Sequence, residues 1–157
     1  MKNRLCLLIM VNKTPYVGAA LICERVIQET DGVLSIVRVV ETFTVAPIRD
    51  LPAGVKRGIE FTLLIMLKSG DVKGKSKVSI RLRYPSGKTK PMGDHEIVLE
   101  GGHSGIQVII QTRVGIEEWG VHWFDIAWEG QMLTSIPLRL VEGSSSDKVT
   151  GSEEAKS

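Results

Sequence analysis

The sequence predicts an all-β fold, a two-sheet antiparallel β-sandwich of immunoglobulin-like or related topology with about eight strands. Apolar and polar residues alternate with a period of two through most of residues 16–142, and no segment carries a convincing helical period. Turn-forming residues separate the alternating segments at intervals of about 8–16 residues, which is typical of sandwiches. A long connection at residues 46–58, rich in proline and glycine, predicts the crossover between the sheets.

The first expected hairpin joins the strands Tyr16–Ile27 and Val33–Val45 across the turn Glu29–Gly32. The Asp31-Gly32 pair in this turn supplies the positive φ that a tight hairpin requires. After the long connection, residues 55–68 fit either a short helix or a buried strand. Their β-branched residues and their even apolar content favour the strand.

Residues 77–84 show the clearest alternation, with one apolar face and one largely basic face. The apolar positions are Val78, Ile80, Leu82 and Tyr84. A turn follows at Pro85–Lys88, and further alternating segments predict strands at residues 96–100 and 106–114.

The last expected hairpin joins Val121–Trp128 to Met132–Val141 across a short Gly-containing connection. In its first strand the parity of Phe124 and Ile126 predicts a core-facing side, on which His122 is expected to be partly buried and hydrogen-bonded. The opposite side carries Trp119, Val121, Trp123 and Asp125.

The 157 residues fit one domain at residues 16–142, flanked by an N-terminal extension or unusual start at 1–15 and a disordered tail at 143–157. Three interpretations of the N-terminus remain open. Met10 could be the functional start, residues 1–20 could act as a signal peptide, or the apolar run could be an ordinary first strand. The first favours a cytoplasmic protein, whereas the second implies a secreted or periplasmic one.

Composition excludes several classes of protein. With 43% hydrophobic and 24% charged residues, the chain is neither disordered nor collagen-like. Its longest N-terminal apolar run, Leu5–Val11, is much shorter than the roughly 20 residues that a membrane-spanning helix needs. Two cysteines make no disulfide framework, and Cys23 is expected to be a small buried hydrophobe.

Strand and turn patterns near both ends resemble those of a family of small uncharacterised bacterial proteins. The residues that carry the resemblance are Gly18–Val26, Asp31–Ile36, Gly120–Ile126, Gly130 and Ile136–Arg139. The resemblance covers about residues 16–142. It implies a compact β-sandwich without an assigned activity, supplies no catalytic residue, and supports Met10 as the start.

No catalytic, cofactor-binding or metal-binding residue is assigned from the sequence. Residues 70–76 are one residue short of a phosphate-binding loop and precede a strand instead of a helix. Gly102–Gly105 lacks the fifth-position glycine of a nucleophile elbow. The three histidines, at positions 95, 103 and 122, have no metal-ligand spacing.

Two features indicate a candidate interaction surface. Between Lys68 and Lys90 there are eight basic residues and one acidic residue, and Lys77, Arg81 and Arg83 share one strand face. Exposed Trp119 and Trp123 would mark a binding patch. A solvated outer face and a centrally buried strand are the simpler interpretations of these two features.

The net charge of +2 hides an asymmetry along the chain. Residues 1–90 carry 16 bases and 7 acids, whereas residues 91–157 carry 4 bases and 11 acids, which gives net charges of +9 and −7. Folding could place these halves side by side or on opposite faces.

We therefore expect a non-enzymatic accessory module that binds another protein through a sheet face or loops. One alternative is nucleic-acid or polyanion binding through the strip from Lys68 to Lys90, with affinity that falls steeply with salt. Another alternative is a hydrolase whose site the sequence does not identify.

Overall fold

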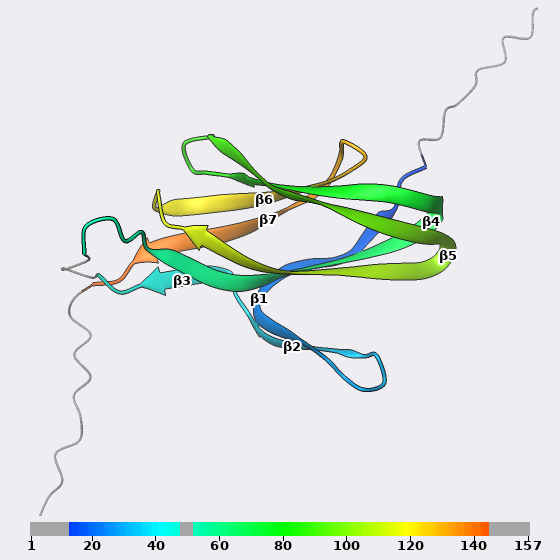
Figure 1. The fold of residues 1–157 in the computed structure, drawn as a ribbon, viewed down its shortest axis with the longest axis horizontal. Helices are drawn as coiled ribbons and strands as arrows, with labels where there is room; N and C mark the ends of the chain where they lie inside the picture. The colour runs from blue at the N-terminus through cyan, green and yellow to red at the C-terminus, as the bar shows by residue number, and fades with distance from the viewer. Residues whose placement is uncertain (1–12, 48–51, 145–157) are drawn as a thin grey trace, which may run out of the picture.

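The computed structural model describes residues 13–47 and 52–144, which form seven β-strands and no helix (Figure 1). Hydrogen bonds join the strands in the order β2-β1-β4-β6-β7-β3, and β5 pairs with β4 outside this path. The described residues hold no helix of the length and apolarity that a membrane crossing requires. The strands are β1 (Tyr16–Gln28), β2 (Leu34–Val39), β3 (Thr42–Val45), β4 (Gly58–Arg83), β5 (Thr89–Gly115), β6 (Gly120–Trp128) and β7 (Gln131–Glu142).

The long hairpin of β4 and β5 organises the fold. β4 has 26 residues and β5 has 27, and the two strands pair along most of their length. β1 pairs with residues 62–68 of β4, whereas β6 pairs with residues 78–83 of the same strand. The first and second halves of β4 therefore hold different neighbours.

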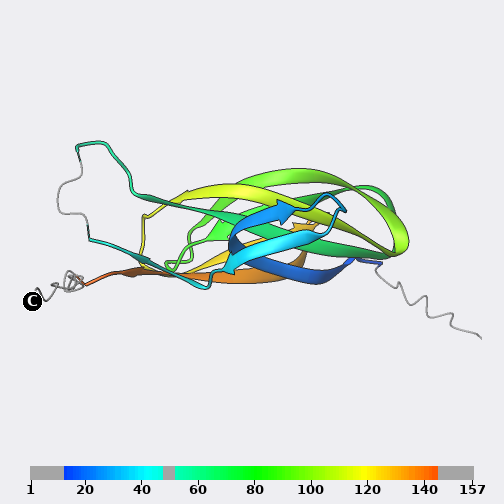
Figure 2. The same ribbon diagram turned by 90° about the horizontal axis from the view of Figure 1, so that it is seen from below.

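A bend separates the two halves of this hairpin. The β4–β5 register shifts between residues 68 and 73, where the chain is rich in glycine. Gly74 and Gly101 adopt φ angles of 107° and 86° in this region, which residues with a Cβ rarely adopt. The hairpin doubles back at the bend, so that its halves face each other (Figures 1 and 2).

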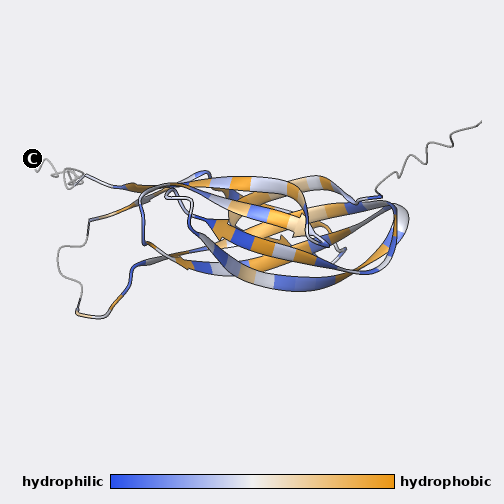
Figure 3. Cartoon of the chain, turned by 90° about the horizontal axis from the view of Figure 1, so that it is seen from above, coloured by the Kyte–Doolittle hydropathy of each residue, from blue (hydrophilic) through white to orange (hydrophobic). Residues whose placement is uncertain are grey.

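The hydrophobic core lies between these facing halves. Phe61 of β4 packs edge-on against Phe124 of β6, with ring centroids 5.4 Å apart, and Phe43 of β3 lies 6.1 Å from Phe61. Apolar residues alternate with polar ones along much of the strands, as the colours in Figure 3 show, which is typical of strands that bury one side. Other buried members include Ile22, Leu63, Ile65, Leu67, Val78, Leu82, Ile126, Leu138 and Leu140.

The number and length of the expected strands need correction. The expected strands at 55–68 and 77–84 are parts of one strand, β4, and those at 96–100 and 106–114 are parts of β5. The glycine-rich segments between them bend the backbone without ending the pairing. The expected strand Val33–Val45 is instead divided into β2 and β3, because the chain leaves β1 and crosses to β7.

The all-β class is confirmed, but the division into two antiparallel sheets is not. Backbone hydrogen bonds connect all seven strands in one sheet, because β4 and β5 pass through both halves. The sheet is mixed, since β3 pairs in parallel with β7. This parallel pair follows from the crossing of β2 into β3 without a reversal of direction.

Several local expectations are confirmed. Within residues 55–68 the strand interpretation is right from Gly58 onward, and the helix alternative is wrong. Cys23 is fully buried, and its burial raises the pKa of the thiol. Gly70 to Ser76 lie in the bent part of β4 and not at the start of a helix. The expectations for residues 1–12 and 145–157 lie outside the described residues.

Candidate interaction surface

One solvent-facing side of β4, β6 and β7 carries most of the residues that the sequence singles out. The strand registers place Arg83 beside Trp123 and Arg81 beside Asp125, and they place Asp125 beside Ser135. The core residues Phe124 and Ile126 of β6 have the opposite parity. We refer to this surface, defined by Lys77, Arg81, Arg83, Trp123, Asp125 and Ser135, as the Asp125 face.

Asp125 lies at the centre of the surface and is only 4% exposed. Arg83 donates two hydrogen bonds to its carboxylate, from Nε at 3.1 Å and from Nη2 at 3.0 Å. The Ser135 hydroxyl donates a third at 2.6 Å. The hydrogen bonds from Arg83 are the main cause of the lowered pKa of Asp125, so the carboxylate is charged at neutral pH.

Arg83 also links this carboxylate to an aromatic ring. Its guanidinium lies 5.5 Å from the centroid of the Trp123 ring, which is within the range of a cation–π contact. Because the bidentate bond to Asp125 fixes the guanidinium plane, Arg83 holds Trp123 in place at the surface. The indole is half-buried.

Arg81 is the least constrained base of the Asp125 face. Its side chain is 54% exposed, and its Nη2 is 4.0 Å from Asp125, beyond hydrogen-bonding distance. Lys77 by contrast forms an ion pair with Asp94 at 3.1 Å. Arg81 borders a pocket of about 470 Å³ whose walls are mostly apolar. The other residues lining this pocket are Ser79, Ile80, Pro91, Asp94, Asp125, Ala127, Gly130 and Met132.

Four of the five candidate residues are therefore brought together: Lys77, Arg81, Arg83 and Trp123. The fifth, Trp119, precedes β6 and is 40% exposed. Among the described residues, no hydrogen bond, ion pair or ring contact joins it to the Asp125 face.

The segment around Trp119 is held by the β4–β5 turn. Lys88 of the turn pairs with Glu117 at 3.1 Å, and the backbone N–H and hydroxyl of Ser86 donate to Glu118 at 2.9 and 2.7 Å. These contacts lower the pKa values of both glutamates. Glu117 and Glu118 thus stabilise a turn.

Sequence reasoning did not identify Asp125 as the centre of the surface. The alternation in β6 already placed it beside Trp123. The sequence does not show that β6 pairs with β4, and this pairing brings the carboxylate of Asp125 opposite Arg81.

Folding brings part of the basic first half of the chain against the acidic second half. The described ion pairs include four in which a base before residue 91 meets an acid after it. They join Lys77 to Asp94, Arg81 and Arg83 to Asp125, and Lys88 to Glu117. The basic first part and the acidic second part therefore lie side by side in the sheet.

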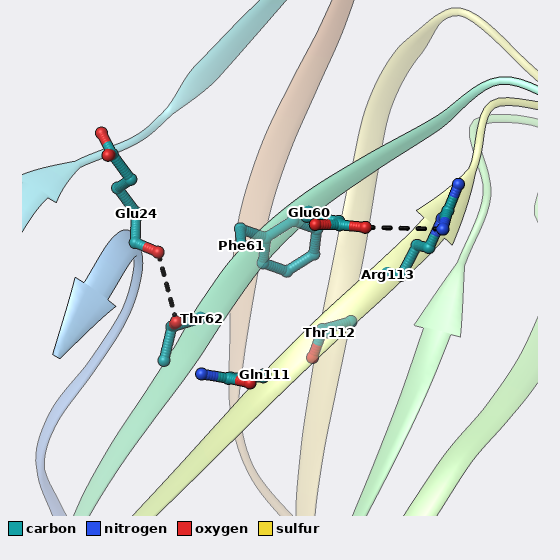
Figure 4. Close-up of a pocket in the computed structure, with 7 residues that line it drawn as sticks. All are labelled: Glu24, Glu60, Phe61, Thr62, Gln111, Thr112 and Arg113. Carbon is teal, nitrogen blue, oxygen red and sulfur yellow. Dashed lines mark hydrogen bonds and ion pairs between the residues drawn. The ribbon is translucent and has the colours of Figure 1, made fainter.

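A second, polar pocket of about 580 Å³ opens where β1 separates from β4 (Figure 4). Across its mouth Glu60 and Arg113 form an ion pair at 3.5 Å, and both side chains are more than two-thirds exposed. On the other side Thr62 donates a hydrogen bond of 3.3 Å to the carbonyl oxygen of Glu24. The pocket is thus a wedge between two diverging strands.

His122 lies on the opposite side of β6 from Asp125, so the two titratable groups do not share a pocket. The imidazole is 1% exposed and packs edge-on against Tyr84. Its Nδ1 lies 3.3 Å from the carbonyl oxygen of Gly120, and its buried Nε2 has no hydrogen-bond partner within the described ranges. Burial, opposed by Gly120 and Glu118, lowers the pKa of His122.

This burial makes stability depend on pH. The unfolded histidine takes up a proton below a pH of about 6.5, whereas the folded one resists it. We therefore expect the free energy of unfolding to fall as the pH drops from about 7 to about 5. Urea unfolding at several pH values in this range measures the effect. In His122→Leu the free energy of unfolding should depend less on pH. An unchanged slope in that variant would show that other groups cause it.

Comparison with known proteins adds a family. A model described as a family of unknown function (DUF6941) matches residues 18–141. None of the curated proteins matches the chain.

Solved structures with some similarity come from larger proteins. A mutant β-glucosidase from Listeria innocua in complex with laminaribiose has a TM-score of 0.45 and 13% identity, over 59% of this chain and 15% of that one. A β-glucosidase from Erythrobacter marinus has a TM-score of 0.44 and 14% identity, over 82% and 15%. A DNA-bound alkylpurine DNA glycosylase from Pseudomonas fluorescens has a TM-score of 0.41 and 14% identity, over 78% and 30%. This chain spans less than a third of each of these proteins, and such similarities support no statement about function.

Proposed function

We propose, from the premise that the chain belongs to DUF6941, a family of unknown function, that it is a non-enzymatic module binding another protein through the Asp125 face. The observation that carries the proposal is the state of Arg81. Asp125 is already compensated by Arg83, so the exposed guanidinium of Arg81 remains available to a partner.

The chemistry of the surface suggests what this partner presents. Arg81 can form a bidentate pair with a carboxylate. Beside it, Met132 is 48% exposed and the walls of the pocket are mostly apolar. Trp123, held by Arg83, adds a rigid aromatic anchor of the kind that dominates binding energy at interfaces. We infer a partner segment that combines an acidic side chain with an apolar one.

Polyanion binding through the strip from Lys68 to Lys90 is the alternative, and the ion pairs weaken it. Lys77, Arg83 and Lys88 each pair with a carboxylate of this chain, which lowers the positive potential along the strip. The hydrolase alternative draws no support from His122 and Asp125, which lie on opposite sides of β6.

The test is affinity capture with the full chain in lysate of the source bacterium, followed by purification of the captured protein and measurement of its Kd. Arg81→Glu should weaken binding by at least about tenfold because a like charge then faces the partner's carboxylate. Trp123→Ala should weaken it by a similar factor through loss of the anchor.

Lys73→Glu is the matched control, since it makes the same change of charge in β4 but in the bend of the hairpin. It should bind the partner with nearly wild-type affinity. The polyanion alternative would be favoured if Lys73→Glu and Arg81→Glu weakened binding equally and the protein also bound nucleic acid with an affinity that falls steeply with salt. Thermal melts of each variant separate loss of binding from loss of folding.

Two finer statements belong to the same proposal. We infer that the sheet acts as a two-layer sandwich of immunoglobulin-like type, which the facing halves of β4 and the contact between Phe61 and Phe124 support. We also infer a bacterial cytoplasmic location. Ala19 and Ala20 of β1 are paired with Met66 and Ile65 of β4, so cleavage of a signal peptide at these alanines would cut through a strand. An intact mass showing that the native chain begins at Ala19 or Ala20 would contradict this location.

A further inference from the structure

A two-stranded arm extends from the body of the protein. β1 pairs with β4 only as far as Cys23, and beyond this residue its hydrogen-bonded neighbour is β2. Within the described ranges β2 pairs with β1 alone. Figure 1 shows the hairpin leaving the facing halves of the sheet. We refer to residues 24–39 as the arm.

The arm is more apolar than an isolated hairpin should be. Four of its large hydrophobic side chains are between 39% and 60% exposed. They are Ile27, Val33, Ile36 and Val39. Two-stranded hairpins are marginally stable in water, and independent stability generally needs at least a third strand. The arm therefore gains by acquiring another strand.

The outer edge of β2 is suited to accept that strand. Its six residues, Leu34–Val39, contain no proline or glycine and one charge, Arg38. Arg38 forms an ion pair with Glu24 at 3.1 Å, but its side chain is 80% exposed, so it can also turn toward a neighbouring chain. The φ of 50° at Arg38 kinks β2 near its end, but Leu34–Val37 is regular and lacks the charges and prolines with which proteins usually prevent pairing between edges.

The charges of the arm indicate that the added strand is a second copy of β2. The tip is acidic, with Glu29 and Asp31, and the opposite end of β2 carries Arg38. When two copies of one strand pair antiparallel about a twofold axis, the tip of each lies beside the base of the other. Each acidic tip would then approach the Arg38 side chain of the partner, whereas a parallel arrangement would bring like charges together.

We propose that the chain forms a homodimer in which the two arms pair edge to edge through β2. The result is a four-stranded sheet in the order β1-β2-β2-β1. The pairing places side chains of equal parity together, so Ile36 and Leu34 of both copies share one face near the axis. The dimer uses a surface separate from the Asp125 face.

Sedimentation of the full chain over a range of concentrations tests the proposal. The wild type should be a dimer, and Ile36→Lys should raise its Kd by at least about tenfold by placing two like charges near the axis. The control is Ile109→Lys, which makes the same substitution in β5 at a side chain that is 41% exposed. The Ile109→Lys protein should remain dimeric. Arg81→Glu should also remain dimeric, which separates this test from that of the Asp125 face.

A charge exchange tests the antiparallel arrangement. Arg38→Glu should dissociate the dimer, and so should the double variant Glu29→Lys with Asp31→Asn, in which Asn keeps the side-chain bond to the Val33 N–H. An equimolar mixture of the two should dimerise, because opposite charges then face each other at both ends. A monomeric wild type, a dimer that survives Ile36→Lys, or a mixture that stays monomeric would overturn the proposal.

Discussion

Replacing Phe124 by alanine is expected to lower the free energy of unfolding by about 3–5 kcal/mol. The ring is fully buried on β6, and its edge packs against Phe61 on the opposite half of the sheet. The substitution removes apolar contacts from both halves, and the rigid strands on either side cannot collapse into the space. Urea unfolding should show a lower midpoint with an unchanged slope.

Val98→Ala is the control for this prediction. Val98 is a large apolar residue of β5 that is 55% exposed, so its truncation should change the free energy of unfolding by no more than about 0.5 kcal/mol. A loss below about 1 kcal/mol for Phe124→Ala would contradict the packing of the two halves against each other.

Asp125→Ala is expected to cost about 1.5–3 kcal/mol of stability, the range for hydrogen bonds to a charged group. It removes the acceptor of three hydrogen bonds from Arg83 and Ser135. The cost should stay below that of a deeply buried pair, because the side chain of Arg83 is 40% exposed and its guanidinium can turn to water. The same variant should release Trp123 and weaken partner binding.

The pH dependence provides a separate check on Asp125. Its pKa is lowered in the folded state, so the stabilisation is present above the unfolded pKa of about 3.9 and is lost as the pH falls toward the folded value. In Asp125→Asn this part of the acid sensitivity should disappear. Asp94→Asn, which removes an exposed partner of Ser79 and Lys77, should retain it. Equal acid sensitivity of Asp125→Asn and the wild type would show that the carboxylate is not held as described.

Local pattern was sufficient to predict the class of fold and which side of most strands is buried. In β6, parity alone separated Phe124 and Ile126 from Trp123, because successive side chains of a strand point to opposite faces. It failed at residues 70–76, which separated two expected strands and instead lie inside β4. A turn and a bend in a continuous strand both require glycine, and only pairing with β5 distinguishes them.

Pairing also limited what could be predicted of the surface. The basic residues of β4 and the Trp123 strand were recognised as two separate features, about 40 residues apart in sequence. No local signal states that β6 lies beside β4, since strand neighbours are chosen by packing across the whole domain. The exposure of the arm could not be predicted for a similar reason. Alternation predicts a hairpin, but it does not show whether another part of the protein covers that hairpin.

The doubling back of the β4–β5 hairpin also has a consequence for how the chain can reach this structure. The pairs are nested, from Arg83 with Thr89 outward to Gly58 with Gly115, so each new pair enlarges an already closed loop by a few residues. The entropic cost of loop closure is therefore divided into small increments as the pairs form across both halves of the sheet. The parallel pairing of Thr42 with Arg139 closes a far longer loop, and it becomes inexpensive only after the hairpin, β6 and β7 are in place. Formation of this one hairpin thus prepares the strand pairing that has the largest sequence separation among the described residues.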